Sequence, residues 1–417
     1  MAQINASIIT IGDELLIGQV IDTNSAWIAQ RLNELGIAVE RRVAVGDATD
    51  AIWNALDEEL NKSDVIIITG GLGPTADDIT KPLLCKYFGG NLVVDDRVLN
   101  HVKGIFERRN RPMLERNIKQ AEVPDNCTVL FNKMGTAPGM WFTKNNRVII
   151  SLPGVPFEMM AIMEDEVLPR LQNMFVSDVI QHRSIITAGE GESFVAERIQ
   201  DLEEALPAHI KLAYLPSYGM VRLRLTGRGS DSLRLSKEMQ LRQEEIANRL
   251  ENIVISLQDL PLEQIVGKSL VEKHATLGLA ESCTGGNLAH LLTQTMGATT
   301  YFKGSIVSYY AQVKQNVLGV KADTLNTHGV VSQATATEMV LGAAALLDTD
   351  YTLSITGLLS GSKDEHGVEP GTVWLAIKHA DVIYTKKLQL FYDRLRNKEM
   401  ATQMALLYLW RFINGKV

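Results

Sequence analysis

Two aspartates, Asp77 and Asp78, follow a glycine-rich turn in the first third of the chain. The turn, Gly70-Gly-Leu-Gly-Pro-Thr-Ala, comes after an apolar strand and opens a helix, where backbone amides can approach a phosphate. Pro74 removes one amide, and two carboxylates would repel a bare pyrophosphate. A divalent cation between carboxylates and phosphates removes this conflict, and magnesium prefers such hard oxygen ligands. The loop therefore favours a metal-assisted phosphate site over the helix-terminal role of a lone aspartate.

More loops are expected at the same edge of the sheet. Glu14 and Glu158 lie in loops that follow predicted strands, and we expect them to join Asp77 and Asp78 as metal ligands. Asn24 either binds the ligand or caps its helix. The loop glycines and threonines expected to bind substrate here are Gly71, Gly73, Thr75, Gly135 and Thr136.

A serine lies at a strand-to-helix turn in the last third of the chain. The run Ala280-Glu-Ser-Cys-Thr-Gly-Gly286 separates a strand at 277–280 from an apolar helix. Helix amides at such a turn can stabilise an oxyanion, so Ser282 is a candidate nucleophile if a base is near. The alternative is an ordinary serine helix cap.

The elements that must position these residues alternate between strand and helix. Strands are predicted at 6–10, 39–45 and 64–69, with amphipathic helices between them, and this pattern indicates a mostly parallel α/β sheet. We predict three domains: an α/β domain over 1–174, a small α+β domain over 175–258 and a second α/β domain over 259–417. Ligand sites of α/β sheets lie at the carboxyl ends of the strands.

Composition excludes several classes of protein. The 417 residues are 46% hydrophobic and 22% charged, so wholesale disorder is excluded. The formal net charge of −8 offers no broad basic field, and nucleic acid is not expected as a partner. Three cysteines and scattered histidines predict neither a disulfide framework nor a zinc site. Apolar runs of strand length predict a cytoplasmic protein that does not enter membranes.

Several motifs resemble the CinA family. They are Ile11-Gly-Asp-Glu-Leu-Leu-Ile-Gly-Gln, the glycine loop above, Gly135-Thr-Ala-Pro-Gly139 and Leu152-Pro-Gly-Val-Pro-x-Glu-Met. The resemblance implies a first domain similar to molybdopterin-binding proteins of the MoaB and MogA type. It also implies hydrolysis of ADP-ribose to AMP and ribose 5-phosphate with a divalent metal. In this scheme the metal lowers the pKa of a bound water, and a carboxylate such as Asp78 takes the proton.

The serine motif, followed by Tyr309-x-x-x-x-Lys314, resembles the family's nicotinamide mononucleotide deamidase domain. The resemblance implies that Ser282 attacks the carboxamide carbon, with Lys314 as base and Tyr309 orienting the pair. Lys314 must then lose its proton near neutrality, which requires a lowered pKa. Thr284 and Gly285 are expected to bind substrate. No cofactor is expected for this domain.

One loop departs from the family pattern. Where relatives usually have Thr-Gly-Ile-Ala-Gly-Pro, this chain has Thr356-Gly-Leu-Leu-Ser-Gly361, so Leu359 and Ser360 replace small residues. If this loop approaches the substrate with its backbone, the added side chains are expected either to narrow the pocket or to remove an amide contact. Thr356 and Gly357 stay candidates for substrate binding. Arg394 is expected to anchor a phosphate.

The resemblance covers essentially the whole chain and implies a homodimeric, two-headed hydrolase of pyridine-nucleotide salvage, whose partners are small nucleotides. One alternative is a non-catalytic binding protein of competence or DNA repair, for which an acidic chain predicts weak, salt-dependent DNA binding. Another alternative is a pterin-binding module in the first domain.

Overall fold

The computed structural model describes residues 4–75, 78–175 and 179–417. The chain divides into two compact units, one formed by residues 1–181 with 227–238 and the other by 182–226 with 239–417. Each unit is described by itself. Within the described residues, no helix is long and apolar enough to cross a membrane.

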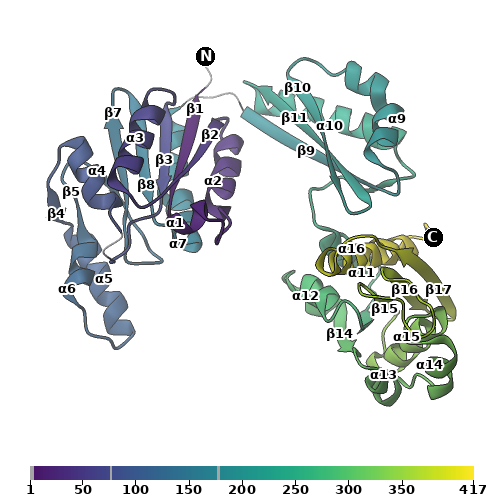
Figure 1. The fold of residues 1–417 in the computed structure, drawn as a ribbon. Coiled ribbons are helices and arrows are strands. Elements are labelled where there is room, and N and C mark those ends of the chain that lie inside the picture. The colour runs from purple at the N-terminus through teal and green to yellow at the C-terminus, as the bar shows by residue number, and fades with distance from the viewer. Residues whose placement is uncertain (1–3, 76–77, 176–178) are drawn as a thin grey trace. The chain divides into compact units, whose positions relative to one another are not determined.

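The first unit contains a six-stranded sheet in the order β2-β1-β3-β8-β7-β6 (Figure 1). β1 lies parallel to β2 and β3, and β3 lies parallel to β8, whereas β7 runs antiparallel to β8 and β6. The strands are β1 (Asn5–Ile11), β2 (Ala38–Val45), β3 (Val65–Thr69), β6 (Thr128–Leu130), β7 (Gly139–Lys144) and β8 (Arg147–Leu152). The predicted strands at 6–10, 39–45 and 64–69 are confirmed to within one residue.

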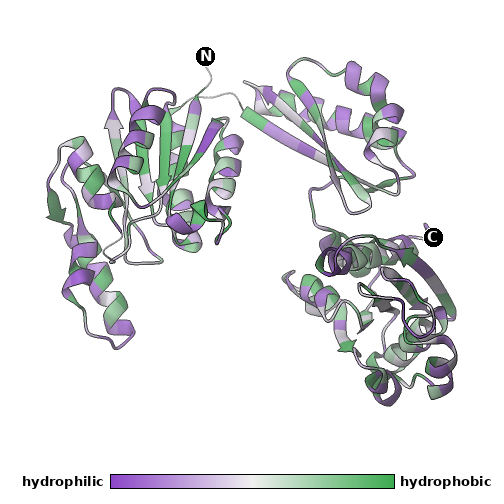
Figure 2. Ribbon diagram, in the orientation of Figure 1, coloured by the Kyte–Doolittle hydropathy of each residue, from purple (hydrophilic) through white to green (hydrophobic). Residues whose placement is uncertain are grey.

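Helices cover both faces of this sheet because side chains of a strand alternate between faces. In β3, Ile66 and Ile68 belong to one core cluster, and Val65 and Ile67 belong to another. Figure 2 shows the strands as largely hydrophobic and the helices as mixed. The helices are α1 (Asp13–Leu16), α2 (Thr23–Glu34), α3 (Thr49–Leu60), α4 (Thr80–Phe88), α5 (Asp96–Arg108), α6 (Glu115–Ile118), α7 (Pro156–Ile162) and α8 (Leu168–Met174).

A small antiparallel pair, β4 (Leu92–Val94) with β5 (Glu122–Pro124), accompanies α5 and α6. Single turns of other helix types complete the connections, at Lys119–Ala121 and Ala298–Thr300 as 3₁₀ turns and at Met163–Val167 as a π turn. The sequence pattern did not predict the β4–β5 pair.

A second sheet has the order β10-β11-β9-β12. Its elements are β9 (Val179–Ala188), β10 (Ile210–Ser217), β11 (Met220–Gly229) and β12 (Val254–Ser256), with helices α9 (Glu192–Glu204) and α10 (Ser232–Arg249). Ile186 of β9 and Ile255 of β12 share one hydrophobic cluster with residues of α11 (Leu262–Glu272) and α16 (Arg394–Ile413), all within the second unit.

The last sheet has the order β14-β13-β15-β16-β17. β13 lies parallel to both neighbours, while β15, β16 and β17 are antiparallel. The strands are β13 (Leu277–Glu281), β14 (Phe302–Val307), β15 (Tyr351–Leu358), β16 (Thr372–His379) and β17 (Val382–Gln389). The remaining helices are α12 (Asn287–Thr293), α13 (Ala311–Leu318), α14 (Ala322–His328) and α15 (Gln333–Leu347). The molecule is therefore a mixed α/β protein, as predicted.

Candidate functional site

The first candidate site is a cavity of about 350 Å³ at the carboxyl ends of β1, β2, β3 and β8. The segments after these strands supply its lining because parallel strands all end at the same edge of the sheet. Glu14 and Glu158 lie in the first turns of α1 and α7, so the prediction that both are in loops is wrong. The sequence-predicted residues that line it are Glu14, Gly71, Gly73, Asp78, Thr136 and Glu158. Asp77 lies outside the described residues.

The glycine turn after β3 is tightly packed. Gly70 and Gly71 have φ values of 115° and 65°, a region that side chains rarely adopt. A Cβ at Gly71 would collide with Thr80 Oγ1, and one at Gly70 would collide with the Ile11 carbonyl oxygen. Glycine is therefore required for the close approach of this turn to α4 and β1.

Asp78 closes the loop. Its carboxylate accepts hydrogen bonds from the amides of Gly73 and Thr75, both at 2.8 Å, and from the Thr75 hydroxyl. The Thr75 hydroxyl is thus engaged by Asp78, and Thr75 is not among the cavity-lining residues, contrary to its expected contact with substrate. Asp78 holds the turn in shape while it still lines the cavity.

Four carboxylates line this cavity: Glu14, Asp47, Asp78 and Glu158. Sequence reasoning missed Asp47, although it follows β2 and the rule of common strand ends would have found it. Such hard oxygen donors fit a divalent cation chemically. Within the described ranges, no group of three acidic, histidine or cysteine side chains is close enough to hold one ion. The described residues therefore supply the donor chemistry of a cation site without a closed set of ligands.

Glu158 is held in place by a neighbouring amide. Its Oε2 accepts a hydrogen bond of 2.6 Å from Asn132 Nδ2. A Cβ at Gly135 would collide with the Glu158 carboxylate, so Gly135 makes room for this side chain. Gly135 itself is not among the lining residues.

Gln120 is a second lining residue that the sequence did not indicate. Its Nε2 donates a 2.8 Å hydrogen bond to Thr136 Oγ1. Lys81 holds the Gln120 backbone by donating to the carbonyls of Lys119 and Gln120 at 3.0 and 3.1 Å. Burial lowers the pKa of Lys81 to about 8, and the nearby charges of Glu122 and Asp78 oppose that shift.

Asn24 does not cap its helix. Asp22 caps α2 by accepting the Ser25 amide at 2.9 Å, and Asn24 lies in the first turn. Asn24 Nδ2 donates to the Gly154 carbonyl at 2.7 Å. It lines a neighbouring cavity of about 140 Å³ and is not among the residues that line the first. Its observed contact therefore ties α2 to the loop after β8.

The second candidate site joins Ser282 and Lys314. Lys314 Nζ donates to Ser282 Oγ at 2.9 Å and to the carbonyls of Ser308 and Tyr309 at 2.5 and 3.4 Å. The lysine comes from α13 and is 1% exposed. Burial lowers its pKa from the ordinary 10.5 to about 8, against a small opposing effect of the Cys283 thiol. A buried amine in contact with a serine hydroxyl is suited to take its proton.

Glu281 changes the expected role of the helix amides. This fully buried carboxylate accepts hydrogen bonds from three amides of the turn and of α12 and from two hydroxyls. The donors are Thr284 Oγ1, Gly286 N, Leu288 N, Ala289 N and Ser305 Oγ. The prediction that helix amides stabilise an oxyanion is therefore wrong, because Glu281 occupies them.

Ser282 does not cap the helix either, since the N-cap of α12 is Gly286. The Ser282 amide donates to the Ile355 carbonyl at 3.0 Å. In the described part of the chain, the amides of Cys283 and Thr284 donate to no backbone carbonyl. Both amides interact with the Cys283 sulfur instead.

Tyr309 faces Arg394 with its side chain. Arg394 Nη2 donates to the Tyr309 hydroxyl at 2.9 Å, and Nη1 donates to Ser360 Oγ at 3.4 Å. The Tyr309 side chain is 61% exposed, and only its carbonyl contacts Lys314. If Tyr309 orients Lys314 and Ser282 as expected, it does so through its backbone carbonyl and not through its side chain.

Two predicted substrate-binding threonines are occupied by internal hydrogen bonds. The Thr284 hydroxyl donates to Glu281, and the Thr356 hydroxyl donates to the Val330 carbonyl at 2.7 Å. Both residues are buried, so their side chains hold the loops in place. Gly285, at φ 59°, faces open space, because no atom lies within 4 Å of the place that a Cβ would take there.

The altered loop after β15 packs differently from the expectation. Leu359 is buried in the hydrophobic core, and Asn397 Nδ2 fixes its carbonyl at 2.8 Å. The expected narrowing of the pocket by the Leu359 side chain is therefore wrong, and Ser360 extends toward Arg394. A Cβ at Gly357 would lie 2.8 Å from Val373 Cγ2 and 3.1 Å from Cys283 Sγ, so this glycine packs against the serine turn.

Comparisons with known proteins match three consecutive segments. Residues 7–173 match the model of a probable molybdopterin binding domain, residues 182–255 that of the damage-inducible protein CinA KH domain, and residues 259–413 that of the CinA C-terminal domain. A crystal structure of a CinA superfamily protein from Klebsiella pneumoniae is 31% identical, with a TM-score of 0.36. It matches 37% of this chain and 96% of that chain.

The similarity to several relatives extends over nearly the whole chain. A CinA-like protein of Flavobacterium psychrophilum is 43% identical over 98% of both chains. A CinA-like protein of Cytophaga hutchinsonii is 45% identical over 98% of this chain and 97% of its own. With such identity over nearly full length, the chain belongs to the CinA family.

Proposed function

We propose that the C-terminal domain is a serine amidohydrolase that converts nicotinamide mononucleotide to nicotinate mononucleotide and ammonia. The observation that carries the proposal is the 2.9 Å contact between Lys314 Nζ and Ser282 Oγ in a buried setting. A neutral Lys314 takes the hydroxyl proton as Ser282 Oγ attacks the carboxamide carbon. The resulting Lys314 ammonium holds the proton that the leaving group needs.

The second half of the reaction returns the enzyme to its starting state. Lys314 gives its proton to the departing nitrogen, so that ammonia leaves and an ester on Ser282 remains. Water then attacks that ester, Lys314 takes a proton from the water, and the proton returns to Ser282 Oγ as the acid is released. The amides of Cys283 and Thr284 are our candidates for stabilising the oxyanion. Arg394, exposed beside Tyr309, is our candidate for the substrate phosphate.

Ammonia release from nicotinamide mononucleotide tests this proposal in the presence of a chelator. We expect activity in the native chain and its loss in Ser282→Ala and in Lys314→Ala. A native chain that releases no ammonia, or a Ser282→Ala variant as active as the native chain, would overturn the proposal.

For the first domain, we propose metal-dependent hydrolysis of ADP-ribose to AMP and ribose 5-phosphate. Four carboxylates and a glycine turn line one cavity, which supports binding of a pyrophosphate together with a cation. Glu14, Asp47, Asp78 and Glu158 would supply carboxylate ligands to a magnesium ion whose set the substrate phosphates complete, and such an ion would neutralise phosphate charge and acidify water. The cavity's own residues position the substrate through Gly73 and the Gln120–Thr136 pair.

AMP formation from ADP-ribose, with and without magnesium, tests this second activity. A chain that retains a pterin through purification and leaves ADP-ribose intact would favour the pterin-binding alternative, which the family match of residues 7–173 raises. We also propose a cytoplasmic homodimer, and light scattering of the purified chain tests the dimer by its mass.

A further inference from the structure

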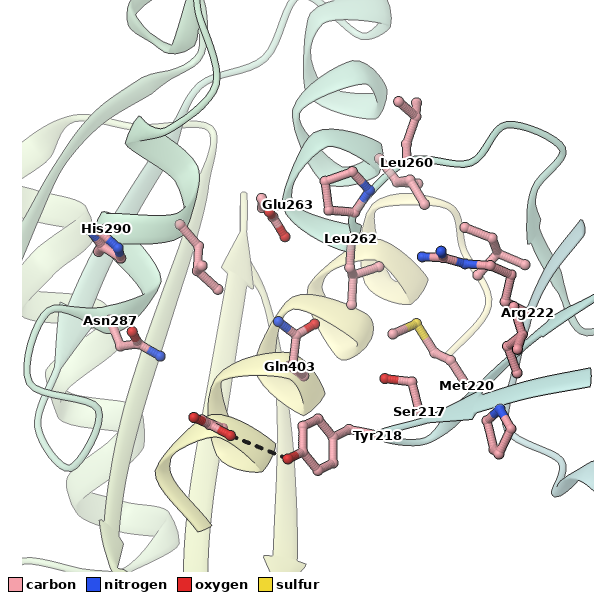
Figure 3. A pocket seen from close by; sticks show the side chains of 17 residues that line it. Ser217, Tyr218, Met220, Arg222, Leu260, Leu262, Glu263, Asn287, His290 and Gln403 are labelled. Carbon is pink, nitrogen blue, oxygen red and sulfur yellow. Dashed lines mark hydrogen bonds between the residues drawn. The ribbon is translucent and has the colours of Figure 1, made fainter. Parts of the chain in front are cut away.

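A third cavity lies in the second unit, apart from both candidate sites. Its volume is about 650 Å³, and its walls come from the β10–β11 hairpin, the start of α11, α12 and α16 (Figure 3). Neither Ser282 nor Lys314 nor Arg394 lines it. A cavity of this size accommodates a small organic molecule.

One part of the wall is apolar. Ile186, Met220, Leu260, Leu262 and Leu291 contribute aliphatic side chains. Such a surface is suited to an aliphatic chain or a flat ring, because burial of apolar area is favourable whatever the orientation.

Most polar side chains of the wall already have partners. The pairs are Tyr218 Oη to Glu399 at 3.2 Å, Arg222 to Asp259 at 3.0 Å, Asn287 Nδ2 to Thr402 Oγ1 at 3.0 Å and His290 with Gln294 at 2.9 Å. Asp259 neutralises Arg222, the arginine of the wall. The cavity therefore offers little to an anionic ligand, and Glu399 adds a negative charge at its edge.

Glu263 differs from these neighbours. It lies in the first turn of α11, is 8% exposed, and Figure 3 shows its carboxylate pointing into the hollow. Over the described ranges, no hydrogen-bond donor or cation is paired with this carboxylate. The helix dipole favours an acid at this position but supplies no bonded partner. A ligand cation in the cavity would be the first charged partner of this carboxylate.

A buried tyrosine lies near Glu263. Tyr301 is a buried neighbour from the turn before β14. Burial raises the pKa of Tyr301, and the charge of Glu263 raises it further.

We propose that this cavity binds a small organic cation with an apolar or aromatic body, whose ammonium or amidinium group pairs with Glu263. The apolar wall takes the body of the ligand, and the unpaired carboxylate selects its charge. The binding site is separate from the chemistry proposed for either domain.

Calorimetric titration of the full chain with benzamidine, and with the neutral isostere benzamide, tests the proposal. We expect benzamidine to bind at least about tenfold more tightly, since a charge-assisted hydrogen bond is worth at least that factor. The Glu263→Gln variant is expected to bind both compounds equally. Glu272→Gln removes the same charge at the exposed end of the same helix and is expected to keep the native preference.

A second variant tests whether the ligand binds in this cavity and leaves the Glu263 carboxylate unchanged. Gln403→Trp fills the cavity from α16, and we expect it to abolish benzamidine binding while it leaves ammonia release unchanged. Equal binding of the two compounds by the native chain, no binding of either, or a preference that survives in both Glu263→Gln and Gln403→Trp would overturn the proposal.

Discussion

The two candidate catalytic sites use their ionisable groups in opposite ways. In the first domain, four carboxylates that follow four different strands line an open cavity, and each is half-buried or exposed. In the C-terminal domain, one lysine is almost completely buried against one serine. The first arrangement gathers negative charge that a cation can neutralise, whereas the second uses desolvation to make a neutral base. One chain thus offers two different electrostatic means of activating a nucleophile.

The largest effect is expected for Ser282→Ala. Loss of the nucleophile should lower ammonia release by about 10⁴-fold, because no other group can form the ester. ADP-ribose hydrolysis by the same preparation should stay unchanged, because that site lies in the other unit, and an unchanged melting temperature serves as the folding control. If both activities fall together, the two sites are not separate as the comparison requires.

A smaller effect is expected when Lys314 is replaced by methionine, and it is a gain in stability rather than a loss. The pKa of Lys314 is lower in the folded chain, about 8, than its ordinary 10.5. Below pH 8 the charged lysine makes its full destabilising contribution to the free energy of unfolding. That contribution disappears as the pH rises from 8 to 10.5. Lys314→Met should stabilise the second unit by on the order of 2 kcal/mol at pH 7 while abolishing deamidation.

Calorimetric melting at pH 7 and at about pH 10.5 measures this difference. The gain in melting temperature should be large at the lower pH and small at the higher one. A methionine variant that melts below the native chain at pH 7 would contradict the role given to burial. Lys268→Met, on the exposed surface of α11, is the matched control and should change little.

For the first domain, Glu158→Gln should reduce ADP-ribose hydrolysis by about 10²-fold and leave ammonia release intact. The change keeps the hydrogen-bonding shape beside Asn132 and removes one negative charge from the cavity. AMP formation at several magnesium concentrations measures the loss, and excess metal should recover part of it. Asp165→Asn, which changes an exposed acid paired with Lys133, should be neutral.

The smallest expected effect is on the pH profiles. Deamidation needs neutral Lys314, so kcat/KM should rise about fivefold from pH 7 to pH 8, nearly double again by about pH 9 and then level off, as expected for a base of pKa about 8. A stopped assay for ammonia at low, fixed substrate measures this rise. A flat deamidation profile over this range would remove the distinction between a buried base and a metal-dependent site.

The strands that position both sites were predictable from the sequence. Val65–Thr69 and Leu277–Glu281 are largely apolar, each is followed by a glycine-rich loop, and both are buried strands. The glycine turn and the serine turn follow directly from them. Nothing local distinguishes Asp47 from other loop acids, and only its place after β2, at the shared end of neighbouring strands, points to the cavity.

Side-chain pairing was less accessible to sequence reasoning. Asn24, Thr284 and Thr356 have residue types suited to ligand binding, yet their side chains hold neighbouring loops. In the sequence nothing distinguishes Glu281 within its motif. In the structure it accepts hydrogen bonds from the amides that were expected to stabilise an oxyanion. Hydrogen-bond partners distant in the chain decide these roles, and local patterns do not contain them.

Local features of the sequence were enough to establish the alternation of strands and helices, the positions of the two turns and the family of the chain, because periodicity and glycine placement are local properties. The packed structure was needed to decide which donors remain available, how deeply Lys314 is buried and that Glu263 points unpaired into a cavity. The physical reason is that desolvation and hydrogen-bond competition depend on every element that packs around a group. They have no counterpart in the order of residues alone.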